Sequence, residues 1–239
     1  MREPAETEKF AVGINDRDGV TAILYGALKK NRAGISVLLG HGAGASQTSP
    51  FMRLFASGLA ERGLDALTFN FLYMEQGRRV PDPKPKLEAC YRAVIKAVLE
   101  HRKLKGNRLV VGGKSMGGRI ASHVAAGEKN NSASDRVSLR VAGLVLLGYP
   151  LHPPGKPQQM RDAHLKAIRA PILFIQGSRD AFGRPDELRV VIERDRLPAT
   201  LQVIDGGDHS FKVPKTSLLP QQQVFETTMD QIAHWSAAL

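Results

Sequence analysis

Short apolar runs rich in β-branched residues alternate along this chain with longer segments in which apolar residues recur with a helical period. That alternation is typical of a parallel sheet whose two faces are both covered by helices. We expect strands over residues 35–40, 64–71, 108–113, 141–148, 171–177 and 200–206, and helices over residues 51–62, 86–101, 116–127, 184–195 and 221–238. The sequence therefore predicts an α/β fold: a doubly wound, mostly parallel central sheet with helices on both faces.

A hairpin is expected ahead of this alternation. Two apolar runs, residues 10–14 and 20–28, flank a polar turn at residues 15–19 and favour a pair of strands at the sheet edge. The chain has 239 residues, and a single core can grow to roughly 250 residues before chains tend to divide. We therefore expect one domain over residues 1–239, with flexibility only in the polar residues 1–9.

Composition restricts the compartment and the chemistry. No apolar run approaches the roughly 20 residues that span a bilayer, and the start lacks the layout of a signal peptide. The single cysteine, Cys90, cannot form an internal disulfide, and no Cys/His cluster has zinc-ligand spacing. We expect a cytoplasmic protein with no membrane contact, no metal and no cofactor, in which Cys90 is a buried helix residue.

The positive charge is unevenly distributed. The formal net charge of the chain is +11. The segment from Arg78 to Arg119 contains twelve Lys/Arg and three Asp/Glu, which gives it a net charge of +9. Such a segment can attract an anionic substrate or nucleic acid. The alternative is a solvated basic face, which we favour because no aromatic-interleaved or zinc-finger pattern accompanies the charge. A nucleic-acid partner is therefore not expected, and the oligomeric state is left open.

Residues 112–120, with the sequence GGKSMGGRI, place Ser115 between a predicted strand and a predicted helix. Gly113 and Gly117 stand two positions to either side. A nucleophile elbow needs this arrangement, because its serine takes a strained backbone conformation and side chains at the flanking positions would clash. We predict that Ser115 is a nucleophile and not merely a small residue in a glycine-rich turn.

A serine nucleophile needs a base and an orienting acid. His209 lies in the loop after the last predicted strand, and Asp180 follows the strand before it. The order Ser115, Asp180, His209 is the order of an α/β-hydrolase triad. The rival acids are Asp205, which directly follows a strand, and Asp208, which is better placed to shape the turn beside His209; we favour Asp180.

The oxyanion hole needs backbone N–H donors, one of which normally comes from the residue after the nucleophile. That residue is Met116. A second donor is expected from the glycine-rich loop after residues 35–40, where Ala43 is preferred and Gly44 is the alternative. His41 in this loop is a candidate for substrate contact, although we favour a role in fixing the loop by hydrogen bonds.

Two other segments supply candidate substrate-binding residues. Arg78 and Arg79 follow a strand, where a guanidinium can bind a carboxylate or phosphate; an internal ion pair with Glu75 or Asp82 is the equal alternative. Residues 149–165 are short and proline-rich for a cap, so we expect a minimal lid over an open cleft. Tyr149 and His152 are candidates for lining that cleft, although His152 can equally cap a turn.

The sequence resembles α/β-hydrolases of the dienelactone-hydrolase-like clan. More narrowly, it is similar to the hydrolase-like family that groups small bacterial proteins with testis-expressed relatives and a subunit of the non-specific-lethal chromatin complex. The matching stretches are GHGAG, FNFLYMEQGRRVPDPKPKLE, GGKSMGGRIAS, GYPLHPPGKP, QGSRDAFG and GGDHSFKVP. One departure is Leu72, where the family favours proline.

The resemblance implies the doubly wound fold and a Ser/His/Asp site without a cofactor. It supplies no substrate, because dienelactone hydrolase itself uses a cysteine nucleophile and the chromatin members are scaffold parts. We therefore predict a serine hydrolase, of carboxylesterase or thioesterase type, that acts on a small ester or acyl substrate, with an anionic substrate as one option. The alternative is a catalytically weak scaffold that uses its basic segment to contact nucleic acid or an acidic partner.

Overall fold

A computed structural model describes residues 6–127 and 141–239 of the chain. Its centre is a sheet of eight strands in the order β1-β2-β4-β3-β5-β6-β7-β8. The strands are β1 (Glu6–Gly13), β2 (Gly19–Gly26), β3 (Ile35–Gly40), β4 (Asp65–Phe69), β5 (Arg108–Lys114), β6 (Val141–Leu147), β7 (Ile172–Gly177) and β8 (Ala199–Ile204). The pairings β1–β2 and β2–β4 are antiparallel, and the other five are parallel. The predicted mostly parallel sheet is confirmed.

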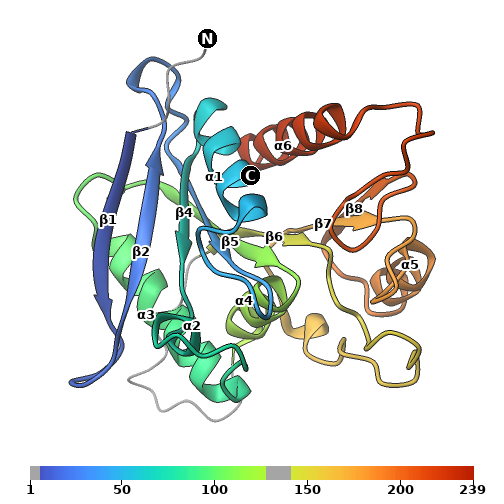
Figure 1. Cartoon of the computed structure of the whole chain (residues 1–239), viewed down its shortest axis with the longest axis horizontal. Coiled ribbons are helices and arrows are strands. Elements are labelled where there is room, and N and C mark those ends of the chain that lie inside the picture. Colours follow the sequence, from blue (N-terminus) through green and yellow to red (C-terminus); the bar gives the residue numbers. More distant parts are fainter. Residues whose placement is uncertain (1–5, 128–140) are drawn as a thin grey trace.

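Helices cover both faces of this sheet. They are α1 (Pro50–Glu61), α2 (Leu72–Glu75), α3 (Lys84–Glu100), α4 (Met116–Ala126), α5 (Pro185–Arg194) and α6 (Gln221–Ala237), with 3₁₀ turns at Lys29–Asn31 and Leu165–Ala167. Figure 1 shows α1 and α6 on one side of the sheet and α3 and α4 on the other. Within the described ranges, no helix combines the length and the apolar character that crossing a membrane requires.

The strand β3 illustrates how the sequence sets this layering. All six of its residues are buried, because both faces of the sheet are covered. Successive side chains of a strand point to opposite faces. Val37 and Leu39 therefore join the core beneath α1 and α6, whereas Leu38 joins the core beneath α3, α4 and α5.

Among the strands and helices predicted from residue 35 onward, most boundaries agree to within one residue. The ends of β4 and β8 and the start of α3 differ by two. Strand β4 ends at Phe69 rather than at residue 71, because the chain turns at once into the short helix α2, whose apolar residues continue the strand-like pattern. Helix α3 begins at Lys84, two residues earlier than predicted. Its Pro85 lies in the first turn, where the missing N–H has no intrahelical role.

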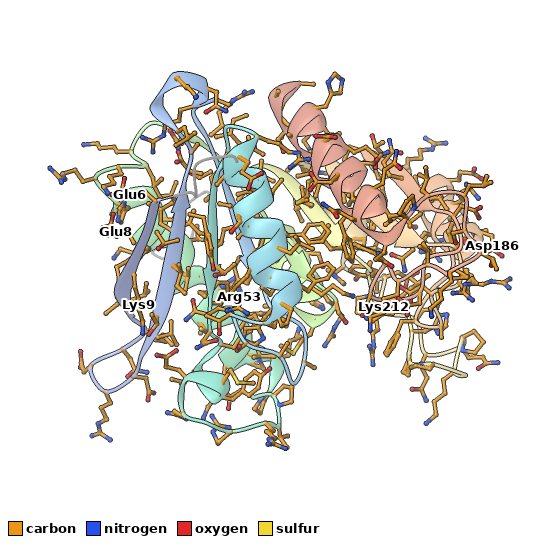
Figure 2. The ribbon with its side chains drawn as sticks, turned by 45° about the horizontal axis from the view of Figure 1, so that its top comes forward. Glu6, Glu8, Lys9, Arg53, Asp186 and Lys212 are labelled. Carbon is orange, nitrogen blue, oxygen red and sulfur yellow. The ribbon has the colours of Figure 1, made fainter. Side chains whose placement is uncertain are left out.

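The hairpin at the sheet edge is confirmed, but it begins earlier than predicted. Residues 6–9, which we expected to be flexible, belong to β1 and pair with β2; residues 1–5 of that expectation lie outside the described residues. Glu6 and Glu8 project from this outer strand (Figure 2), and Lys103 Nζ lies 3.4 Å and 2.8 Å from their carboxylates. Charges on an edge strand disfavour pairing with a further strand.

The parallel pairing brings functional loops together. Strands β3, β5, β6, β7 and β8 run in the same direction, so their carboxyl ends meet at one edge of the sheet. In open α/β sheets, ligands bind beyond this edge. The loops that follow β3, β5, β7 and β8 are the ones in which the sequence places its candidate catalytic residues.

Candidate active site

The turn between β5 and α4 holds Ser115 in a strained conformation, with φ 51° and ψ −115°. The end of β3 packs against this turn so closely that a Cβ on Gly117 would lie 2.1 Å from the Gly40 carbonyl oxygen. A Cβ on Gly113, whose φ is +150°, would lie 2.2 Å from the same oxygen. Only glycine fits at both positions, and the sharp turn they permit is the geometry of a nucleophile elbow.

A chain of hydrogen bonds links Ser115 to His209 and Asp180. The Ser115 Oγ lies 2.9 Å from His209 Nε2, and His209 Nδ1 lies 2.8 Å from Asp180 Oδ2 and 3.0 Å from Asp180 Oδ1. With Nδ1–H donating to the carboxylate, Nε2 is left to accept the proton of the serine hydroxyl. Phe182 stacks on the imidazole at a centroid distance of 4.2 Å and limits how the ring can turn.

Asp180 is fully buried, with 0% of its surface exposed, and the protein surrounds it with hydrogen-bond donors. Its Oδ1 accepts the backbone N–H of Phe182 at 2.8 Å, and its Oδ2 accepts an N–H of the Gln176 side chain at 2.8 Å. Gln176 also donates to the Gly183 carbonyl at 2.7 Å. A buried carboxylate needs such partners, because burial without them costs several kcal/mol.

The two rival acids have other partners. Asp208 Oδ1 accepts the backbone N–H groups of Ser210 and Lys212 at 2.7 Å and 2.9 Å, and so shapes the turn that carries His209. Asp205 Oδ1 lies 3.5 Å from the Ser178 hydroxyl. The structure therefore puts Asp180 against His209 and engages the other two carboxylates elsewhere.

The loop after β3 approaches the same point. The Ala45 N–H donates to the Gly42 carbonyl at 3.2 Å, which closes a turn around Ala43 and Gly44. Ala43 lines the cavity in front of Ser115. Met116 is the first residue of α4, and the N–H groups of a first helical turn have no intrahelical acceptor. The arrangement is compatible with the predicted donors Ala43 and Met116, with Gly44 next to the first.

His41 lies beneath this loop and not in the cavity. Its Nδ1–H donates to the Gly42 carbonyl at 2.8 Å, and its Nε2 accepts the Phe71 N–H at 3.1 Å. Both ring nitrogens are therefore used by the backbone, and burial lowers the pKa of His41 to about 4. The ring is neutral and ties the loop after β3 to the end of β4, which leaves it unavailable for substrate contact.

Tyr149 and His152 also lie outside the cavity, contrary to their candidate role in the cleft. Tyr149 is buried, and its hydroxyl donates to the Arg161 carbonyl at 2.7 Å. His152 is buried too, with Nε2 at 3.1 Å from a carboxylate oxygen of Glu187 on α5. The proline-rich segment is thus anchored by buried residues at its start, whereas its residues 154–160 are exposed. No residue of 149–165 lines the cavity in front of Ser115.

The arginine candidates are likewise not brought to the cavity. Arg78 lies 2.8 Å from Asp82, which is the internal ion pair expected as the alternative to substrate binding, and Arg79 is exposed. Other cations of the basic segment are also paired: Lys84 and Arg92 with Glu88, and Lys103 with Glu6 and Glu8. These pairs favour the interpretation of this segment as a solvated face.

A cavity of about 620 Å³ opens in front of Ser115 and His209. Its walls are mostly apolar: they include Phe51 and Leu54 of α1, Phe182 of the loop after β7, and Phe225 of α6. The cations that line it are Lys114 and Lys212. We did not predict these lining residues from the sequence. Phe51 and Phe225 are far apart along the chain and read only as core positions of amphipathic helices, so no local pattern marks them as lining a cavity.

Comparisons with known proteins place this chain in a family. The model of a family described as "Alpha/beta hydrolase domain" matches residues 33–237. A dienelactone hydrolase from Anabaena variabilis is similar in structure, with a TM-score of 0.71 and 19% identity over 97% of this chain and 96% of that one. An α/β serine hydrolase without a lid from Xanthomonas campestris has a TM-score of 0.71 and 16% identity over 98% and 97%. The resemblance drawn from the sequence is confirmed at the level of this fold.

A third neighbour is an esterase from Pyrococcus furiosus, with a TM-score of 0.74 and 18% identity over 97% of this chain and 90% of that one. At these identities the likeness shows the fold, whereas substrates can differ between proteins of one fold.

The neutral state of His41 predicts a dependence of stability on pH. The pKa of His41 is about 4 in the folded protein against an ordinary 6.5, so only the unfolded chain takes up this proton as the pH falls from 6.5 to 4. His41 therefore contributes a loss of unfolding free energy of up to about 1.4 kcal/mol per pH unit in that window. When the free energy of unfolding is measured by urea denaturation at several pH values, it should fall less steeply with decreasing pH for His41→Gln than for the parent protein.

His234→Gln is the matched control, because His234 is exposed on α6. Equal slopes for the parent protein and His41→Gln would contradict the assignment of a buried, neutral His41.

Proposed function

Because the chain belongs to the alpha/beta hydrolase domain family, we propose that it is a serine hydrolase that cleaves an ester or thioester through an acyl-enzyme. The observation that carries the proposal is the unbroken hydrogen-bond chain from Ser115 Oγ through His209 to Asp180. Family membership and shared fold leave the chemistry open, since function lies in the site and not in the fold. A cavity of about 620 Å³ suits a small-molecule substrate.

The first half of the reaction forms the acyl-enzyme. His209 Nε2 takes the proton of the Ser115 hydroxyl while Oγ attacks the substrate carbonyl carbon, and the carbonyl oxygen becomes an oxyanion. When the tetrahedral intermediate collapses, the bond to the leaving alcohol or thiol breaks and His209 returns the proton to it. Asp180 holds the imidazole in the required tautomer throughout and stabilises its protonated form.

The second half repeats these steps with water. His209 removes a proton from water, whose oxygen attacks the acyl carbonyl, and the Ser115 oxygen leaves with the proton that His209 returns. In both halves the oxyanion is stabilised by the N–H groups of Met116 and Ala43, with Gly44 as the alternative to Ala43. The N-terminus of α4 adds its favourable dipole at the same point.

A scaffold role for the basic segment is the rival hypothesis, and the geometry favours it less. A scaffold needs neither a strained serine nor a fully buried aspartate oriented on a histidine, and both are costly to maintain. We include a reducing, cytoplasmic location in the proposal because Cys90 is buried as a free thiol.

Replacing the nucleophile tests the proposal directly. Ser115→Ala should lower kcat/KM for p-nitrophenyl butyrate by about a thousandfold or more, because the attacking oxygen is lost. A fluorophosphonate probe should label the parent protein and leave Ser115→Ala unlabelled. Ser57→Ala on α1 is the matched control. Equal hydrolysis by Ser115→Ala and the parent protein would overturn the proposal.

The identity of the acid is tested separately. Asp180→Asn should lower kcat by about 10⁴-fold, because an amide does not hold His209 in the tautomer that accepts the serine proton. Asp205→Asn, a substitution of the same kind on the neighbouring strand end, should change kcat only a few-fold. Steady-state kinetics on folded variants, checked by circular dichroism, decides between them. A large loss in Asp205→Asn with a small loss in Asp180→Asn would reverse the assignment.

A further inference from the structure

Lys114, the residue directly before Ser115, is a buried cation at the cavity. Only 8% of its surface is exposed, although lysine is almost always a surface residue. Its Nζ donates to the His209 carbonyl at 2.5 Å and lies 5.7 Å from the ring centroids of both Phe51 and Phe211. The Lys114 side chain therefore runs from the elbow to the wall of the same cavity that Ser115 faces.

The protein partners leave this ammonium incompletely paired. An ammonium has three N–H donors, and the His209 carbonyl accepts one. Across residues 6–127 and 141–239, no carboxylate oxygen lies within 4.0 Å of Lys114 Nζ, although Asp180 and Asp208 act on it from a greater distance. Burial lowers the pKa of Lys114 to about 8, so the group still carries its charge at neutral pH. A buried cation with unused donors is unfavourable until an anion pairs with it.

The remaining charge of the cavity has the same sign. Lys212, which is labelled in Figure 2 on the loop between β8 and α6, lines the cavity and is exposed. The described residues that line this cavity include no aspartate or glutamate. The walls formed by Phe51, Leu54 and Phe225 are apolar, so the electrostatic interaction between two charges in this cavity is stronger than in water. An anionic group on a substrate complements such a cavity.

We propose that Lys114 is the recognition site for a carboxylate carried by the substrate, so that the preferred esters are anionic. This inference rests on the proposed serine hydrolase function and names the substrate class of the same site. The substrate carboxylate accepts hydrogen bonds from the Nζ–H groups that are not donated to the His209 carbonyl. The apolar walls contact the hydrocarbon part of the substrate between the carboxylate and the reacting carbonyl. Lys114 thus acts as a specificity-determining residue beside the nucleophile.

The test compares matched esters of similar shape. One pair is p-nitrophenyl hydrogen adipate and p-nitrophenyl 6-methylheptanoate, in which an isopropyl end replaces the carboxylate of the acyl chain. A second pair moves the charge to the alcohol: the hexanoyl esters of 4-hydroxy-3-nitrobenzoate and of 4-isopropyl-2-nitrophenol. For each pair the measured quantity is the ratio of kcat/KM for the anionic ester to kcat/KM for the neutral one. The two pairs show from which side of the ester the carboxylate comes.

Three variants accompany the parent protein. Lys114→Met removes the charge and keeps the length of the side chain. Lys114→Gln also removes the charge but retains an N–H donor for the His209 carbonyl, which covers the case in which the first variant does not fold. Lys96→Met makes the same charge change on the exposed face of α3 and is the matched control.

The expected result is a fall in the ratio of about tenfold to a hundredfold in at least one pair for both Lys114 variants, with Lys96→Met unchanged. A loss that is equal for anionic and neutral esters would mean that Lys114 only positions His209, and it would overturn the inference, as would unchanged ratios in both pairs. If the parent protein hydrolyses the neutral esters, the proposed hydrolase function holds even where the inference about Lys114 fails. If the parent protein cleaves none of the four esters, the proposed function fails and the inference falls with it.

Discussion

The first turn of α4 packs directly against the end of β3, and this contact determines the geometry of the site. Gly117 and Gly113 both face the Gly40 carbonyl oxygen at distances that admit no side chain. This contact fixes the sharp turn at Ser115 and directs its hydroxyl to the edge where the parallel strands end. The loops after β7 and β8 then bring Asp180 and His209 to the same edge, where they meet Ser115. The fold is thus a frame that brings residues distant in sequence to one serine.

His209 is held from two sides by opposite charges. The Asp180 carboxylate accepts from the ring at Nδ1, and the Lys114 ammonium donates to the backbone carbonyl of the same residue. Phe182 stacks on the face of the same ring. A base that takes and returns a proton within one reaction gains from such fixation, because its Nε2 must meet the same oxygen each time.

The sequence predicts well those features that depend on local pattern and on the order of residues along the chain. The apolar runs of β3 to β8 indicate the strands, and the order of Ser115, Asp180 and His209 along the chain indicates the candidate catalytic residues. The direction of side chains in the loops is not predictable in this way. Tyr149 and His152 follow a strand end as functional residues do, yet both turn inward to buried partners. Gln176 has only one signal, a polar residue inside a buried strand, because its contact with Asp180 depends on the turn that follows.

If Ser115 is the nucleophile, it becomes acylated during turnover, and peptide mass spectrometry detects the acyl group. The parent protein is mixed with p-nitrophenyl acetate, quenched in acid within the first turnover and digested. We expect an added acetyl group on the peptide that contains Ser115, and this group should disappear when turnover is allowed to finish before the quench. Turnover without acylation of that peptide, or an acetyl group that persists on another residue, would contradict this role of Ser115.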